Sequence, residues 1–159
     1  LPVGAFGGKR QIMEYLTPLG PVYQAGTLSG NPVAVSAGAA VLKYIMKNKP
    51  YPRLEKKTGE LVLGLRNIFQ AANVEVQINQ IGSMFTIFFS NNPVMDYAAA
   101  KLSNTSKYAA FFRYMLKAGI LFPPSQFETA FVSVAHTNDN LEKTIGAVEK
   151  WKRNIPKSG

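Results

Sequence analysis

The sequence contains no cysteine and only one histidine, His136. Disulfides, cysteine-based metal sites and cysteine nucleophiles are therefore excluded. Acidic residues are also few, nine in 159, and none lies beside the histidine, so a metal site is not expected. A chain without cysteine gives no indication of secretion, and we expect a cytoplasmic protein.

Long hydrophobic runs are missing as well. No stretch of eighteen or more apolar residues occurs, so we expect no membrane-spanning helix. The chain begins with Leu1 instead of methionine, which leads us to expect a fragment of a longer protein.

Negative charge is scarce relative to positive charge, with 18 Lys and Arg against nine Asp and Glu, a formal net charge of +9. Such a balance can indicate nucleic acid or acidic lipid as a partner. The basic residues are spread along the chain, however. Their densest cluster, residues 43–57, falls where one predicted helix ends and another begins, so we interpret it as a solvated face and expect neither nucleic acid nor membrane as a partner.

The apolar residues, 47% of the total, follow periodic patterns that predict the secondary structure. Helical spacing predicts helices over residues 9–15, 32–46, 53–72, 105–118 and 138–154, and residues 97–104 are predicted to be loop with a helical turn. The spacing places Tyr108 and Leu116 on the inward face of 105–118, and Ile155 on the apolar face of the last helix. Alternating or continuous apolar residues predict strands over 74–78, 83–89, 120–122 and 131–135, with 83–89 in the centre of a sheet. The helix at 32–46 has Asn31 and Pro32 as a start signal, and its small residues 34–40 predict a buried stretch.

From residue 53 onward the order is helix, two strands, helix, two strands, helix. The connections are too short for many parallel crossovers, so we expect an α+β fold with an antiparallel or mixed sheet covered by helices. Residues 1–45 do not close on themselves and are predicted to be the end of another domain, while residues 46–159 form the smaller α+β domain. Trp151 lies on an apolar stripe of the last helix and is expected in the core.

The segment from Tyr23 to Pro32 combines two glycines and two hydroxyls with a helix start. Amide groups there, the helix dipole and the hydroxyls of Thr27 and Ser29 favour an anion such as phosphate. A plain turn without a ligand explains the same residues, and no Gly-Lys-Ser/Thr follows that would indicate a Walker loop.

Three strings resemble the glutamate-1-semialdehyde aminomutases, a family among the class III aminotransferases and fold-type-I pyridoxal-phosphate enzymes. They are Leu1 to Gly8, the Gly-Thr-Leu-Ser-Gly-Asn-Pro string at 26–32, and Pro124 to Glu128 followed by residues 131–137. The resemblance covers the chain in order. Thr129-Ala130 departs from the pattern, where Ala-Gly is common.

The resemblance implies an α/β parent enzyme, an intramolecular aminotransferase of tetrapyrrole synthesis that converts glutamate 1-semialdehyde to 5-aminolevulinate with pyridoxal or pyridoxamine phosphate. Gly26 and Thr27 would bind the cofactor phosphate of the neighbouring subunit in a homodimer. Tyr23 and Glu128 would contact the small-molecule substrate.

No lysine of this chain stands in the family's context for the Schiff-base lysine, since Lys9 already lies beyond the glycine-rich match. We expect that lysine upstream of Leu1, no catalytic residue in this chain, and no activity of the chain alone. A two-substrate class III aminotransferase and a non-catalytic domain are the alternatives. His136 can be an acid or base, but its place at a strand end favours a structural role.

Overall fold

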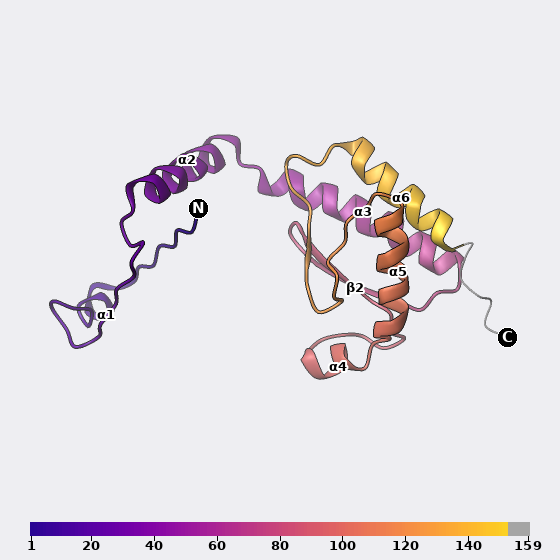
Figure 1. The fold of residues 1–159 in the computed structure, drawn as a ribbon, viewed down its shortest axis with the longest axis horizontal. Coiled ribbons are helices and arrows are strands. Elements are labelled where there is room, and N and C mark those ends of the chain that lie inside the picture. The colour runs from indigo at the N-terminus through magenta and orange to yellow at the C-terminus, as the bar shows by residue number, and fades with distance from the viewer. Residues whose placement is uncertain (153–159) are drawn as a thin grey trace. The chain divides into compact units, whose positions relative to one another are not determined.

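The computed structural model of the chain describes residues 1–152 and divides into two compact units, residues 1–49 and a second unit that begins at Pro50. Figure 1 shows the helices and strands of each unit, and each unit is described by itself.

The first unit contains the one-turn helix α1 (Arg10–Met13) and the long helix α2 (Pro32–Asn48). As predicted, Asn31 begins α2: its side-chain oxygen accepts hydrogen bonds from the backbone N–H groups of Val33 and Ala34, both at 3.1 Å. The helix ends at Lys49, whose backbone is left-handed with φ 43°.

The prediction that residues 34–40 are buried is wrong for this unit. Of these small residues only Ala34 is buried, while Ala39 and Ala40 are exposed. The physical reason is that the described first unit holds no sheet and no second long helix that could cover α2. Within residues 34–40, Gly38 has a close neighbour, because a Cβ added there would lie 3.1 Å from a methyl carbon of Val3.

The second unit begins with helix α3 (Tyr51–Ala71), two residues earlier than predicted, with prolines at positions 50 and 52 at its start. Its apolar stripe is buried as predicted at Leu54, Leu61, Leu65 and Ile68. Helix α6 (Asn138–Lys152) packs against α3 and helix α5 (Thr105–Lys117). The short helix α4 (Tyr97–Lys101) lies in the stretch predicted to be loop with a helical turn.

The sheet has three antiparallel strands in the order β1 (Gln77–Ile81), β2 (Met84–Phe88), β3 (Ala130–Phe131). Strand β2 is central, as predicted. A tight turn joins β1 to β2, and Gly82 provides the positive φ of 55° that this turn needs. The α+β fold with an antiparallel sheet is therefore confirmed.

Three strand predictions need correction. Strand β1 starts at Gln77 and not at residue 74, and β3 covers 130–131, so it shares only Phe131 with the predicted strand 131–135. Residues 120–122 form no strand, because the N–H of Ile120 bonds the Met115 carbonyl at the end of α5 and Pro123 has no N–H to pair. Phe122 is buried instead by packing its ring edge-on against Phe85 and Phe111.

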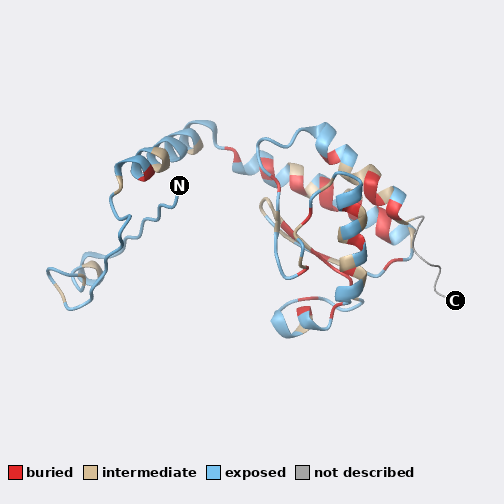
Figure 2. Cartoon of the chain, viewed as in Figure 1, coloured by how far each residue is buried: buried red, intermediate tan, exposed pale blue. Residues whose placement is uncertain are grey.

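The core lies in the second unit, where Figure 2 shows the buried residues concentrated on α3, α5, α6 and the sheet. Its centre is a set of mutually packed rings from three helices and the residue that follows β2: Phe69, Phe111, Trp151 and Phe89. Trp151 is in the core as predicted. Leu116, predicted to point inward, is half exposed, and Ile155 lies outside the described residues. Within residues 1–152, no helix has the length and apolar character required to cross a bilayer.

Candidate functional site

The loop before α2 holds three of the four predicted site residues, Tyr23, Gly26 and Thr27. It is built from two consecutive turns: the Ser29 N–H donates to the Gly26 carbonyl at 2.9 Å, and the Asn31 N–H donates to the Leu28 carbonyl at 3.1 Å. Gly30 has φ 72°, which favours glycine. At Gly26 an added Cβ would lie 3.1 Å from the Ser29 hydroxyl oxygen, so this turn closes tightly.

The hydrogen-bond donors that are free for an anion belong to the loop and not to the first turn of α2. Asn31 already occupies the first free N–H groups of α2, those of Val33 and Ala34. In contrast, the hydroxyl and N–H of Thr27 and the N–H of Leu28 make no hydrogen bond within the described chain and are exposed. An anion would therefore be held by the loop itself and not by the end of the helix.

These loop donors fit a phosphate group. A threonine hydroxyl and adjacent backbone N–H groups are donors of the kind that bind phosphate oxygens, and the tight turn at Gly26 lets a ligand approach the backbone closely. Tyr23 precedes these donors in the same loop and is 80% exposed, and its hydroxyl makes no hydrogen bond with the residues described.

Glu128, the fourth predicted residue, belongs to the second unit. It is exposed in the loop 123–129, where its N–H donates to the Ser125 carbonyl at 3.1 Å. It lines a pocket of about 370 Å³ together with His136 and with apolar side chains that include Leu121 and Phe131. The pocket thus combines one carboxylate with apolar walls, an arrangement common in small-molecule sites.

Tyr108 is a residue of this region that sequence reasoning did not single out as functional. It is buried on α5, and its hydroxyl donates to the Pro123 carbonyl at 2.7 Å. Burial raises the pKa of Tyr108 to about 12, and the carboxylate of Glu128 adds to the increase.

His136 bonds the backbone, in agreement with its predicted structural role. Its Nδ1 accepts from the Ser133 N–H at 3.0 Å and lies 3.0 Å from the Ser133 hydroxyl. Its carbonyl accepts from Lys57 Nζ at 2.7 Å. The ring is thereby held at the rim of the pocket that contains Glu128.

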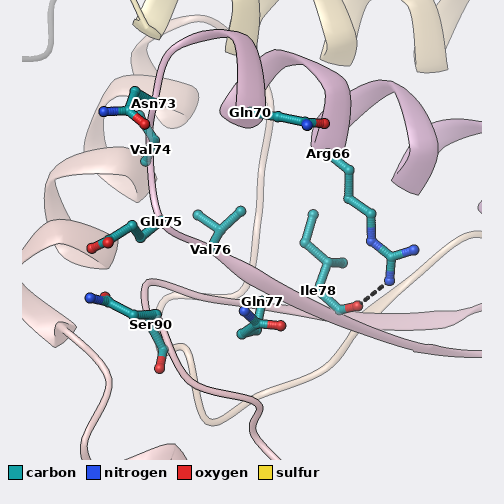
Figure 3. Close-up of a pocket in the computed structure, with 10 residues that line it drawn as sticks. Arg66, Gln70, Asn73, Val74, Glu75, Val76, Gln77, Ile78 and Ser90 are labelled. Carbon is teal, nitrogen blue, oxygen red and sulfur yellow. Dashed lines mark hydrogen bonds between the residues drawn. The ribbon is translucent and has the colours of Figure 1, made fainter.

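A second pocket, of about 490 Å³, lies between the end of α3 and the start of β1 and contains no predicted site residue (Figure 3). Its one guanidinium, that of Arg66, is directed to the Ile78 carbonyl at 2.5 Å. With this cation engaged by the backbone, nothing in the pocket singles out a ligand.

Comparison with known proteins gives a consistent result. The model of the class-III aminotransferase family matches residues 1–147. The chain is 52% identical over 145 residues to the glutamate-1-semialdehyde 2,1-aminomutase of Sulfurihydrogenibium azorense and 47% identical over 149 residues to that of Persephonella marina. These alignments cover 91% and 94% of this chain, but only 34% and 35% of the relatives, so the chain spans about a third of their length.

Solved structures agree on the fold. A β-phenylalanine aminotransferase from Variovorax paradoxus superposes with a TM-score of 0.84 over 93% of this chain and 34% of its own, at 20% identity. An omega-transaminase from Sphaerobacter thermophilus gives 0.77 over 92% and 34%, at 21% identity. Both likenesses concern the fold alone.

Proposed function

The chain belongs to the class-III aminotransferase family, and on this premise we propose that it is the carboxy-terminal part of a glutamate-1-semialdehyde 2,1-aminomutase. The observation on which the proposal depends is the identity of about half the residues to enzymes of that name over nearly the whole chain. The enzyme would convert glutamate 1-semialdehyde to 5-aminolevulinate for tetrapyrrole synthesis.

We propose that the loop before α2 binds the phosphate of pyridoxal or pyridoxamine phosphate. The Thr27 hydroxyl and the free N–H groups of Thr27 and Leu28 would donate to the phosphate oxygens, and Gly26 would allow the close approach. The cofactor supplies the electron sink and the amino group, while this chain orients it.

Tyr23 and Glu128 would each contact the substrate. Glu128 is an exposed carboxylate at an apolar pocket, and it would orient the amino or carboxyl end of the five-carbon substrate through hydrogen bonds. No lysine of this chain stands in the family's cofactor-lysine context, so the chain alone is expected to be inactive.

We further propose that the first unit is the end of the large cofactor-binding domain and the second unit the small domain. The phosphate site would be completed by the neighbouring subunit of a homodimer in the cytoplasm. The short, exposed loop 23–31 supports this, since a phosphate held there would still have a free side for a partner.

The test is a chimera. This chain replaces the matching third of the Sulfurihydrogenibium azorense relative, and the product is assayed with semialdehyde alone, without a second amino acceptor. We expect 5-aminolevulinate to form. A chimera that is folded and binds cofactor, but requires a separate amino acceptor, would instead indicate a two-substrate aminotransferase.

Thr27→Val in this chimera tests the phosphate loop. A hydrogen bond to a charged group contributes about 1.5–3 kcal/mol, so the affinity for pyridoxal phosphate should fall roughly 10- to 100-fold. Thr27→Ser retains the hydroxyl and is the matched control. Equal affinities of the Val and Ser variants would remove Thr27 from the site.

A further inference from the structure

The loop that presents Glu128 leads into β3, where Ala130 pairs with Phe85, and within the described chain it has one hydrogen bond of its own to another element of the second unit. Among the described residues, a single hydrogen bond joins segment 123–129 to another element, the bond from the Tyr108 hydroxyl to the Pro123 carbonyl at 2.7 Å. The other bonds of the segment are internal: the Glu128 N–H donates to the Ser125 carbonyl, and the Phe127 N–H to the Ser125 hydroxyl.

The remaining contacts of the loop do not fix its direction. Gln126 is 2% exposed, but neither atom of its amide has a hydrogen-bond partner within the described chain, so it anchors the loop by its volume alone. Phe127 touches the ring of Tyr97 at 6.1 Å, and both rings are substantially exposed. Volume and exposed ring contacts restrain a loop less specifically than a buried hydrogen bond does.

Tyr108 is itself held rigidly. It is 4% exposed, and its ring packs between those of Phe89 and Phe111 in the aromatic core. Its hydroxyl therefore has one defined position on α5, and the Pro123 carbonyl must come to it. Through the internal turn that follows, this contact at Pro123 and the pairing of Ala130 in β3 hold the two ends of the segment that carries Glu128.

We infer that Tyr108 is a positioning residue for Glu128: its hydroxyl fixes the loop 123–129 so that the carboxylate stands at the pocket shared with His136. The inference rests on the proposed function for the role of Glu128 toward substrate. The geometry of the link itself is independent of that function.

A double-mutant cycle in the chimera tests the inference, with Tyr108→Phe, Glu128→Gln and the pair together. If Tyr108 acts through Glu128, Tyr108→Phe should lower kcat/KM about tenfold when Glu128 is present, but less than about twofold when the Glu128→Gln change is already in place. Tyr114→Phe is the matched control, because Tyr114 is partly buried on the same helix and its hydroxyl makes no hydrogen bond in the described residues. Independent, multiplicative effects of the two changes would overturn the inference.

A second measurement uses the 159-residue chain and needs no activity. Backbone ¹⁵N relaxation should show order parameters at 125–128 falling from about 0.85 toward about 0.6 in Tyr108→Phe, with no change in Tyr114→Phe. Unchanged order at 125–128 would overturn the inference. If the unmutated chimera is inactive, the proposed function fails and this measurement alone decides the role of Tyr108.

Discussion

Tyr108 donates its hydroxyl hydrogen from a buried position, so its ionisation is linked to the stability of the second unit. The folded pKa, about 12, is higher than the ordinary value of 10.0. The neutral form is thus favoured by folding. The contribution of the neutral phenol to the free energy of unfolding is fully present below pH 10. It is lost as the pH rises toward 12, where the phenol ionises in the folded as well as the unfolded protein. Two pKa units correspond to roughly 2–3 kcal/mol.

Between about pH 9 and pH 12, we therefore expect the free energy of unfolding of the unmutated chain to fall by roughly 2 kcal/mol more than that of Tyr108→Phe. Urea unfolding followed by Trp151 fluorescence at each pH measures this difference. Tyr114→Phe is the control and should follow the unmutated chain. Parallel pH profiles for all three proteins would show that Tyr108 titrates normally.

At single positions the clearest success is the Asn31-Pro32 pair, which indicates a helix start through local chemistry alone and is confirmed. Thr27 and Glu128 stand in strings that resemble a family, and their roles in a site stay predictions. Tyr108 was predicted correctly as an inward residue, but its hydroxyl bond to Pro123 joins positions 15 apart in sequence, and no local pattern contains it. Gln126 was missed because a glutamine between serine and phenylalanine gives no signal of burial.

Two glycines inside helices of the second unit differ in their surroundings. Gly146 on α6 is in open space, and a Cβ there would meet no atom within 4 Å. At Gly64 on α3 a Cβ would lie 2.9 Å from Ile145 Cδ1 and 3.3 Å from its Cγ1. Gly64 therefore permits the close approach of α3 and α6, whereas Gly146 has no such role.

Gly146→Ala should raise the free energy of unfolding by about 0.5–1 kcal/mol, because alanine favours the helix. Gly64→Ala should lower it by about 1 kcal/mol, because crowding against Ile145 outweighs the same helical gain. Urea unfolding measures both. Adding Ile145→Val, which removes Cδ1, should restore most of the loss. A stabilising Gly64→Ala would show that Ile145 moves aside freely.

Helices were predicted from sequence more accurately than strands. The apolar stripes of α3, α5 and α6 repeat over three turns or more. The ends of α3 and α5 and the start of α6 differ from the predicted ones by at most two residues, and the predicted end at 154 lies outside the described residues. Residues 120–122 and 132–135 are short apolar segments that look like strands locally. The Ile120 N–H bonds the end of α5, and the Ser133 N–H bonds the ring of His136, so among the residues described only the Val132 N–H still pairs beside β2, with the Ser83 carbonyl. Such pairing depends on tertiary contacts.

At the scale of the whole chain, the core belongs to the second unit alone. Every residue of the main hydrophobic cluster lies between Leu54 and Trp151. A segment with a closed core of this kind can fold without its neighbours. The first unit, in contrast, has a single buried apolar residue, Ala34.

Residues 50–159 produced alone should therefore unfold cooperatively, with a free energy within about 1 kcal/mol of that of the full chain. Trp151 lies in the core and reports the transition by fluorescence, while far-ultraviolet circular dichroism provides an independent signal. Residues 1–49 alone are the matched counterpart and should show no cooperative transition. Loss of cooperativity in the 50–159 protein would mean that the first unit contributes to its core.

The α+β character and the antiparallel sheet followed from the order and spacing of elements, because short connections exclude most parallel crossovers. The burial of α2 could not be predicted in the same way. Its small residues indicate that another element could pack closely against it. The pattern within the helix does not show whether such an element is present.

The way Asn31 begins α2 has a consequence for the proposed cofactor site. Because the Asn31 side chain accepts hydrogen bonds from the first N–H groups of α2, the first turn of the helix should keep its structure when no phosphate is bound in the neighbouring loop. Apo and holo forms would share one backbone, and recharging with vitamin B6 phosphate would require no refolding and little ordering entropy.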